Sequence, residues 1–335
     1  MVAAIVSVSI LWAGGPSDRL VLMPDGRFAP SPTAPLHVGN LRTALIGWLC
    51  ARRDGGRHLL RIEDLDPVAS RPEHVQRHLA DLTALGLDWD GDPVRQSQRR
   101  PLYDRALARL EDLDLLYPCY CTRREAAEAA QAPHEHLPDG AYAGTCAHLD
   151  SVARSRLERD GRTPAWRVRA GAAQVTVIDA LAGTISGVVD DFVVRRRDGV
   201  PAYNLAVVVD DADQGIVEVV RGDDLRPGTP RQAWLADVLG QKRPSWVHVP
   251  LVVGPDGERL AKRHGAVTLT DLEAVGVTAA MLLAHLAASI GLCEPDDTVT
   301  ADGLRRRFTG DRAVAGLGGG PWMFTAPPVD GADQE

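Results

Sequence analysis

A proline-rich stretch near the N-terminus carries residues that could bind a phosphate or a nucleotide. It reads RFAPSPTAPLHVGN over 27–40 and ends with His37, Gly39 and Asn40 where a helical pattern begins. Prolines fix the backbone, a glycine allows close approach to it, and a helix N-terminus offers N–H groups to an anion. We expect His37 to donate a hydrogen bond to phosphate. Taken alone, such a stretch is more often a surface loop with a solvated histidine.

A second loop, GERLAKRHG over 257–265, is basic and flanked by glycines. A mobile loop carrying Arg259 and Lys262 could close on a polyphosphate and stabilise a leaving pyrophosphate. By itself it would be a charged surface turn. If folding brings it next to the histidine loop, the pair indicates nucleotidyl transfer.

Three of the five cysteines, Cys119, Cys121 and Cys146, cluster in the middle of the chain, whereas Cys50 and Cys293 are isolated. The spacing is too uneven for a disulfide framework and favours a metal site in a reducing compartment. Zinc takes four ligands, usually Cys or His, so one ligand is left to find. Three unliganded cysteines are the alternative.

The elements that must position these residues alternate between strand and helix patterns in the first third of the chain, which predicts a parallel sheet with crossover helices. Short alternating runs over 165–197 predict antiparallel strands, with a hairpin turn at Asp198 and Gly199. Helices are expected over 41–53, 71–85, 101–116 and 229–239, with a helical pair over 271–292, and strands over 57–62, 205–210, 216–220 and 246–253.

Composition is that of a globular protein, with 45% hydrophobic and 24% charged residues among 335. A net charge of −8 argues against a generally basic nucleic-acid coat but leaves room for a local basic face. No segment is suited to crossing a membrane, and the apolar start over 1–15 lacks a signal peptide's basic end, so we expect a cytoplasmic protein. A local basic face could include residues that contact nucleic-acid phosphates, although a residue of this kind is more often simply a solvated charge. The candidates are Arg99, Arg100, Arg123, Arg124 and Arg195–Arg197.

Several ordered motifs resemble class I aminoacyl-tRNA synthetases. PSPTAPLHVGN is similar to their "HIGH" loop and RLAKR to their "KMSKS" loop. The glutamyl subgroup is resembled by GRFAPSPT, by RIEDLD over 61–66, by YNLA over 203–206, by RGDDL over 221–225 and by TPRQ over 229–232. The matches run in family order from Gly26 to Gly265.

This resemblance implies residue roles. The amino acid L-glutamate would be bound by Arg27, Ser31, Glu63, Tyr203 and Arg221, with Glu63 holding the α-ammonium group. ATP, with Mg²⁺, would be bound by Pro30, His37, Gly39, Asn40, Arg259 and Lys262, of which His37, Asn40 and Lys262 would be catalytic. The charges are reasonable, because an amino dicarboxylate needs two cationic contacts and one anionic contact.

Departures from the family pattern occur at three positions. Ala34 stands where glycine is usual, so that turn must avoid positive φ. Arg259 replaces the first lysine of the basic loop and Ala261 its serine. Because Lys262 is kept, we expect slower chemistry at most.

The pattern CxC…YxxxC resembles the zinc site of one branch, the glutamyl-Q tRNA(Asp) synthetases, in which a tyrosine oxygen is the fourth ligand. That implies a structural zinc held by Cys119, Cys121, Tyr142 and Cys146. His134, His136 and His148 remain competitors for the fourth position.

The predicted architecture is α/β: a class I, Rossmann-type catalytic domain with an inserted zinc-containing α+β subdomain and short C-terminal helices. Only residues 263–335 follow Lys262, which leaves no room for the family's anticodon-binding domain. The expected boundaries are 1–22 (disordered extension), 23–118 and 201–265 (two catalytic halves), 119–200 (zinc-binding insertion resembling an acceptor-end-binding region), 266–310 (helical region) and 311–335 (disordered tail).

The resemblance and the short C-terminal region together imply an enzyme that activates L-glutamate with ATP and attaches it to the queuosine base of tRNA(Asp). Three alternatives stay open. The chain could charge a tRNA 3′ end as a truncated glutamyl-tRNA synthetase, pass glutamate to a small-molecule amine, or bind RNA without catalysis. We expect a monomer.

Overall fold

A mainly parallel sheet forms the centre of the structure, a computed structural model that describes residues 25–130, 141–260, 262–265, 267–309 and 314–327. Adjacent strands are parallel except for the last pair, which is an antiparallel hairpin. From one edge to the other the described strands are β3 (Val94–Arg95), β2 (His58–Ile62), β1 (Gly26–Phe28), β9 (Glu218–Gly222), β10 (Ser245–Val249), β6 (Ala173–Asp179) and β7 (Gly183–Val189).

The strand order reverses at β1. From β1 the chain moves to β2 and β3 on one side, and later returns to place β9 and β10 on the other side. Loops leaving the carboxyl ends of β1 and β9 therefore diverge, and ligands of open α/β sheets bind in such a crevice.

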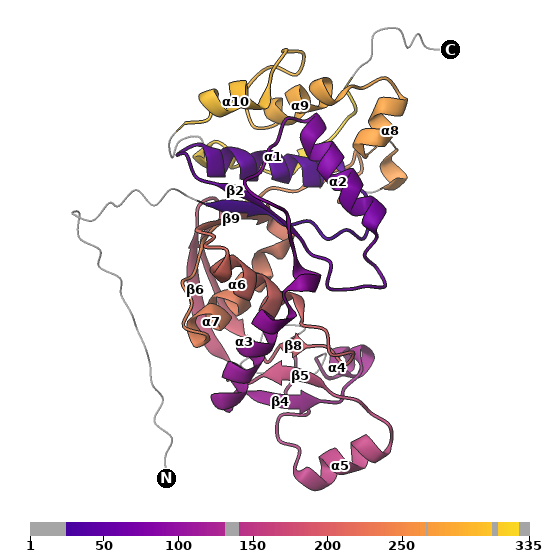
Figure 1. The fold of residues 1–335 in the computed structure, drawn as a ribbon, viewed down its shortest axis with the longest axis vertical. Coiled ribbons are helices and arrows are strands. Elements are labelled where there is room, and N and C mark those ends of the chain that lie inside the picture. The colour runs from indigo at the N-terminus through magenta and orange to yellow at the C-terminus, as the bar shows by residue number, and fades with distance from the viewer. Residues whose placement is uncertain (1–24, 131–140, 261, 266, 310–313, 328–335) are drawn as a thin grey trace, which may run out of the picture.

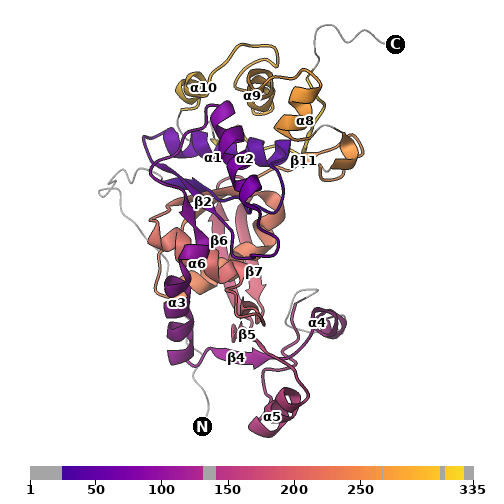
Figure 2. The same ribbon diagram turned by 45° about the vertical axis from the view of Figure 1, so that its right-hand side comes forward.

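Helices cover both faces of the sheet (Figures 1 and 2). On one face, a large apolar core includes residues from α1 (Val38–Arg52), α2 (Pro72–Ala84), α8 (Leu269–Ala274), α9 (Ala279–Ala288) and α10 (Ala301–Arg307). A second core includes residues from α3 (Arg100–Asp112), α6 (Tyr203–Asp213) and α7 (Thr229–Val238). These two helical layers confirm the expected α/β, Rossmann-type architecture.

A smaller antiparallel sheet lies at the end of the molecule opposite α8–α10 (Figure 1). It contains β4 (Leu116–Cys119), β5 (Ala165–Val168) and β8 (Val193–Arg195), with α4 (Arg123–Ala130) and α5 (Ser151–Arg159) beside it. The β6–β7 hairpin falls inside the expected insertion 119–200, yet it joins the main sheet, where Trp246 of β10 pairs with Asp179. The insertion is therefore not one separate block.

The predicted strand over 205–210 is wrong, because these residues lie in α6. Residues Leu205–Asp211 are all buried, since α6 packs against α3, α7 and β8. A helix buried all round shows no polar stripe, and its run of valines looks like a strand. The helices expected over 41–53, 71–85, 101–116 and 229–239 are confirmed with shifted ends, as is the helical pair.

The segment 314–327 corrects the expectation of a disordered tail over 311–335. Val314, Leu317 and Phe324 are buried in the first core. Next to them, β12 (Trp322–Met323) pairs in parallel with β11 (Val252–Val253). The many glycines of this segment suggest disorder, and the pattern does not show that its few apolar side chains pack into the core. Residues 1–24, 310–313 and 328–335 lie outside the described part.

Short 3₁₀ helices complete the described elements: η1 (Gln96–Gln98), η2 (Asp223–Gly228) and η3 (Lys262–His264). Within the described ranges, no helix combines the length and apolar character needed to cross a membrane.

Candidate functional site

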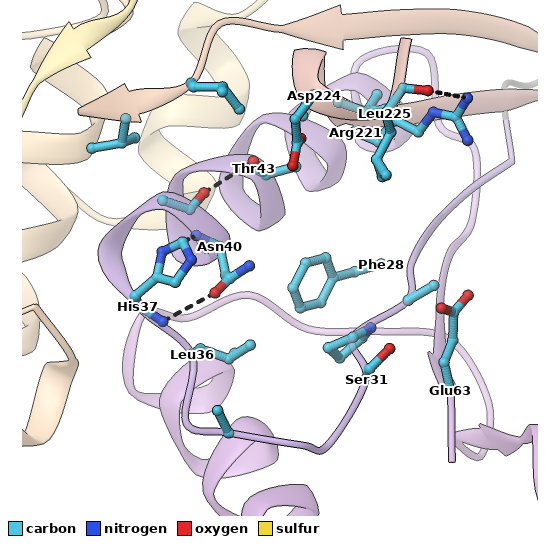
Figure 3. A pocket seen from close by; sticks show the side chains of 18 of the residues that line it. Phe28, Ser31, Leu36, His37, Asn40, Thr43, Glu63, Arg221, Asp224 and Leu225 are labelled. Atoms are coloured by element: carbon cyan, nitrogen blue, oxygen red, sulfur yellow. Dashed lines mark hydrogen bonds between the residues drawn. The ribbon is translucent and has the colours of Figure 1, made fainter. Parts of the chain in front are cut away.

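A cavity of about 550 Å³ opens where β1 and β9 end (Figure 3). Loops from both sides of the strand-order reversal contribute to it, as the sheet topology requires. The predicted glutamate and ATP residues that line it are Arg27, Pro30, Ser31, His37, Gly39, Asn40, Glu63, Tyr203, Arg221 and Arg259. Folding thus brings together segments that are far apart in the sequence.

His37 is the N-cap of α1 and shares a reciprocal pair of hydrogen bonds with Asn40. The Asn40 N–H donates to His37 Nδ1 at 3.3 Å, and the His37 N–H donates to Asn40 Oδ1 at 3.1 Å. Because Nδ1 accepts, a neutral ring carries its proton on Nε2. Burial, followed by the positive charge of Arg259, lowers the pKa of His37. The ring is thereby prepared to donate from Nε2.

Gly39 makes room for this ring. A Cβ at position 39 would lie 2.9 Å from His37 Cε1, closer than real side chains approach. The glycine therefore leaves room for the histidine ring, a packing requirement that the sequence pattern alone does not reveal. Ala34, the other unusual position in the loop, has no positive φ, as expected.

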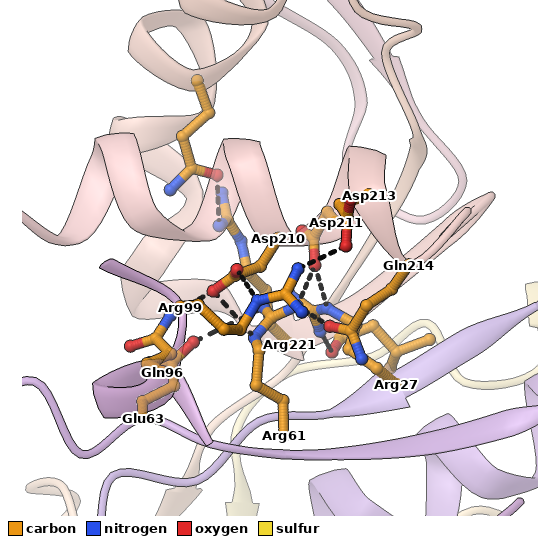
Figure 4. Close-up of polar contacts among 12 residues, drawn as sticks. Arg27, Arg61, Glu63, Gln96, Arg99, Asp210, Asp211, Asp213, Gln214 and Arg221 are labelled. Atoms are coloured by element: carbon orange, nitrogen blue, oxygen red, sulfur yellow. Dashed lines mark hydrogen bonds and ion pairs between the residues drawn. The ribbon is translucent and has the colours of Figure 1, made fainter. Parts of the chain in front are cut away.

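Glu63 lies at the cavity wall beyond β2, beside a buried network of arginines and carboxylates (Figure 4). Arg61 Nη2 is 3.5 Å from Glu63 Oε1 and is itself fully buried. Burial raises the pKa of Glu63, although the charges of Arg61 and Arg27 oppose that rise. A bound ammonium group would add a further charge that favours the carboxylate form.

Arg27 projects from β1 and is fixed on one side only. Its Nε donates to Asp211 Oδ1 at 3.1 Å and its Nη1 to the Val220 carbonyl at 3.4 Å. Neither contact uses Nη2, so this nitrogen can bind a carboxylate in the cavity that Arg27 lines.

Arg221 is held much more firmly than Arg27. Its Nε donates to His248 Nε2 at 3.0 Å, and His248 Nδ1 donates to Asp179 at 2.6 Å. Other N–H groups donate to Gln232, Thr229 and the Leu225 carbonyl. Four of the five N–H groups of this guanidinium are thus engaged. Arg221 lines the cavity mainly as a positive charge fixed by these hydrogen bonds. The sequence motif predicts its charge but not this anchoring.

Tyr203 begins α6 and borders two cavities. It is 43% exposed, and it lines both the site cavity and an adjoining cavity of about 830 Å³. Although the side chain is partly exposed, desolvation against the protein, followed by the negative charge of Glu63, raises the pKa of Tyr203. The adjoining cavity also shares Ser31 and Glu63 and extends to Cys119 and Cys121.

The basic loop reaches the same cavity through Arg259, whose Nη1 lies 2.9 Å from Asp224 Oδ2. Lys262 begins η3, which lies in the same loop of the chain. The side chain of Lys262, like Ala261, lies outside the described residues.

The three clustered cysteines come together near β4, with their sulfur atoms all within 4.8 Å of one another. The Tyr142 hydroxyl lies 3.3 Å from Cys119 Sγ and 3.7 Å from Cys121 Sγ, while Cys121 and Cys146 are 3.5 Å apart. Ligands of a tetrahedral zinc at about 2.0–2.3 Å lie roughly 3.3–3.8 Å from each other. The cluster is therefore compatible with zinc.

Arg167 supports this cluster electrostatically. Its Nε donates to Cys119 Sγ at 3.3 Å, and its guanidinium lies 3.6 Å from the centre of the Tyr142 ring. Hydrogen bonds from Cys146, then Tyr142 and Arg167, outweigh burial and lower the pKa of Cys119 to about 4. Of the competing histidines, His148 is exposed and outside the cluster, and His134 and His136 lie outside the described residues.

Most of the candidate phosphate contacts are occupied by protein groups. Arg99 pairs with Asp210 and Asp213, Arg100 with Asp104, and Arg124 with Glu128. Arg195 lies over the Trp166 ring, Arg196 pairs with Asp66 and Asp198, and Arg197 donates to the carbonyls of Tyr120 and Cys121. Arg123, on α4, is exposed and lines the adjoining cavity.

Comparisons with known proteins agree with this geometry. Residues 25–316 match the family described as tRNA synthetases class I (E and Q), catalytic domain. The chain is 57% identical to a glutamyl-Q tRNA(Asp) synthetase of Nocardia farcinica, over 80% of this chain and 85% of that protein. It is 47% identical to one from Symbiobacterium thermophilum, over 83% and 90%.

A solved structure is also similar. It is a glutamate tRNA ligase from Elizabethkingia meningosepticum in complex with its amino acid, with a TM-score of 0.76 and 25% identity. The match covers 91% of this chain and 67% of that chain.

Proposed function

The chain belongs to the glutamyl-Q tRNA(Asp) synthetases and to the class I (E and Q) tRNA synthetase family, and from that premise we propose that it activates L-glutamate with ATP and transfers it to queuosine in tRNA(Asp). One observation carries the proposal. A single cavity is lined by the Glu63 carboxylate, three arginines and a histidine-capped helix N-terminus, which match the charges of glutamate and of a nucleotide phosphate.

Glutamate binds at the Glu63 end of the cavity. Its ammonium group pairs with Glu63, and one carboxylate accepts from Arg27 Nη2. Arg221 attracts the other negative charge from a fixed position, and Ser31 and Tyr203 complete the wall. The bound amino acid is thus oriented through charges at three points.

ATP binds at the His37 end. The Nε2–H of His37, the side-chain amide of Asn40 and the start of α1 donate to its phosphates. A glutamate carboxylate oxygen attacks the α-phosphorus, forming an acyl–phosphate bond as the bond to pyrophosphate breaks. Arg259 and Lys262 neutralise the leaving pyrophosphate, and Mg²⁺, if bound with ATP, would share that charge. Positioning and electrostatics account for the rate enhancement, and no protein nucleophile is required.

The second step needs space for an acceptor next to the adenylate. The 830 Å³ cavity shares Ser31, Glu63 and Tyr203 with the first, and we assign it to the modified base. A hydroxyl of the queuosine cyclopentenediol attacks the glutamyl carbonyl, and AMP leaves. We further propose that the chain acts as a monomer in the cytoplasm, where its substrates occur.

Zinc fits the cysteine cluster by distance and by donor chemistry. Cys119, Cys121 and Cys146 would bind it as thiolates and Tyr142 through its oxygen. When bound, the ion supplies a structural crosslink between β4 and the 142–146 loop. We assign it no part in the reaction.

The test is transfer of labelled L-glutamate, with ATP, to purified acceptors. The proposal predicts label on tRNA(Asp) that contains queuosine and none on tRNA(Glu) or small amines. Label on tRNA(Glu) would favour ordinary charging of a 3′ end, a candidate supported by 39% identity to a glutamate–tRNA ligase of Syntrophus aciditrophicus. Label on amines without RNA would indicate a small-molecule ligase. Failure of glutamate-dependent ATP–pyrophosphate exchange would indicate a non-catalytic protein.

A further inference from the structure

We propose that Asp211, a residue of α6 that touches no substrate in the scheme above, is the positioning residue for the glutamate site. One of its oxygens holds two arginines at once, and these arginines serve the two ends of the bound amino acid. The inference rests on the proposed function, and it adds a residue that the family motifs did not single out.

The shared contact is made by Asp211 Oδ1 (Figure 4). It accepts from Arg27 Nε at 3.1 Å and from Arg61 Nη1 at 2.8 Å. Asp211 is 184 residues from Arg27 in the chain, so only folding of the second catalytic half onto the first creates the contact. The α6 helix thus links the two halves at the site.

Arg27 is fixed on the edge away from substrate. Its contacts with Asp211 and with the Val220 carbonyl use Nε and Nη1, so the direction of Nη2 is set before glutamate arrives. An arginine fixed in advance loses less freedom when it binds a carboxylate. Removing the negative charge from Asp211 would leave Arg27 able to turn away from the cavity.

Arg61 connects Asp211 to Glu63, because its guanidinium contacts both carboxylates. It is fully buried, and its Nη2 lies 3.5 Å from Glu63 Oε1 while its Nη1 is held by Asp211 and by Gln214 Oε1 at 2.8 Å. A second carboxylate, Asp210, lies 3.8 Å from Arg61 Nε. Asp211 therefore fixes the guanidinium that stabilises the ionised form of Glu63.

Burial makes these contacts strong. The side chains of Arg27 and Asp211 are 5% and 9% exposed, so little water competes for their charges. The two arginines also lower the pKa of Asp211 despite its burial, so it stays charged. A charge held in this way restricts its partners more than an exposed ion pair would.

The experiment compares wild-type protein with Asp211→Asn, which keeps the shape and one acceptor oxygen but removes the charge. Calorimetry gives the Kd for L-glutamate without ATP, and glutamate-dependent ATP–pyrophosphate exchange gives KM and kcat. We expect the Kd and KM for glutamate to rise about 10- to 100-fold, as for loss of a charge-assisted contact. The KM for ATP stays unchanged and kcat falls by less than about threefold.

Asp213→Asn is the matched control. Asp213 lies on the same helix and pairs with Arg99 at 2.5 Å, but it is half exposed and contacts neither Arg27 nor Arg61 through the bonds described. This variant should bind glutamate like the wild type. A purely structural role for Asp211 would instead lower kcat, ATP affinity and the thermal midpoint together.

A double-mutant cycle tests whether the effect passes through Arg27. In an Arg27→Lys background, Asp211→Asn should raise the glutamate Kd clearly less than it does in the wild type. Additive effects, or an unchanged Kd in Asp211→Asn alone, would overturn the inference. If the wild type does not bind glutamate at all, the proposed function fails together with this inference, whereas normal wild-type binding isolates the question of Asp211.

Discussion

His37 and Asn40 form two reciprocal hydrogen bonds at the start of α1, so the imidazole that caps the N-terminus of the helix also lines the cavity. Its Nδ1 serves the helix, and its Nε2 remains for a ligand. The two roles can be separated by substitution, because asparagine is a good N-cap residue but cannot place a donor where Nε2 lies.

We predict that His37→Asn keeps the stability of α1 but slows glutamate activation about 10²- to 10³-fold, the usual effect of losing one donor to developing charge. His37→Ala should slow it similarly and also lower the free energy of unfolding by about 1 kcal/mol. Denaturant unfolding and pyrophosphate exchange measure the two effects. Equal activity of His37→Asn and wild type would remove His37 from phosphate binding.

Tyr142 offers a test of the metal site. Tyr142→Phe removes the oxygen that lies 3.3 Å from Cys119 Sγ, so we predict weaker zinc retention during dialysis against a chelator and a lower thermal midpoint. Tyr142→His supplies a common zinc ligand and should restore much of the retention. Metal content is measured by elemental analysis. Full zinc retention by Tyr142→Phe would assign the fourth ligand elsewhere.

His248 connects Asp179 to Arg221 in a chain of buried contacts. In His248→Phe both neighbours lose a hydrogen-bond partner, so we predict a loss of about 1–3 kcal/mol in unfolding free energy. Glutamate KM should rise because Arg221 loses one of its four anchoring hydrogen bonds, while ATP KM stays constant. Steady-state exchange kinetics and denaturant titration provide both values. An unchanged glutamate KM would show that His248 matters only for stability.

His58, in β2, gives a prediction for pH. It is 1% exposed, and burial lowers its pKa from about 6.5 to about 4. Between these values the unfolded chain binds a proton that the folded protein does not, so stability falls as the pH falls through this range, by up to about 3 kcal/mol for this residue. His58→Asn, which does not titrate, should show a flatter stability profile between pH 6.5 and 4. Parallel profiles of the two proteins would contradict this.

Sequence patterns predict those helices and strands that have one buried face and one exposed face, because their polar and apolar residues then alternate with a regular period. Half-buried helices such as α2 show an apolar stripe, and the β6–β7 hairpin shows alternation. The turn expected at Asp198 and Gly199 is also present, closed by an antiparallel bridge between Arg195 and Pro201, and Gly199 has a positive φ. The sequence of α6 looks like that of a strand because seven successive residues, Leu205–Asp211, are all buried. Periodicity is informative only where one face meets water.

Some residues of the candidate site can be predicted from local sequence motifs, and others cannot. Loop residues such as His37 and Arg27 lie in recognisable local motifs, and the structure brings them to one cavity. Asp211 and His248 sit in apolar runs, and only their distant partners explain why charged or titratable side chains are buried there. An acidic pair at the end of the run VVVDD was the available signal.

The central claim concerns the atom that receives glutamate. The most direct measurement incubates the protein with ATP and labelled L-glutamate on tRNA(Asp) that lacks its 3′-terminal adenosine, prepared with and without queuosine. The account predicts that the queuosine-containing tRNA is labelled and that the tRNA without queuosine is not. If label instead appears only on intact tRNA(Asp), which keeps its 3′-terminal adenosine, and does so with or without queuosine, the account is contradicted. That result would identify an enzyme that charges tRNA ends.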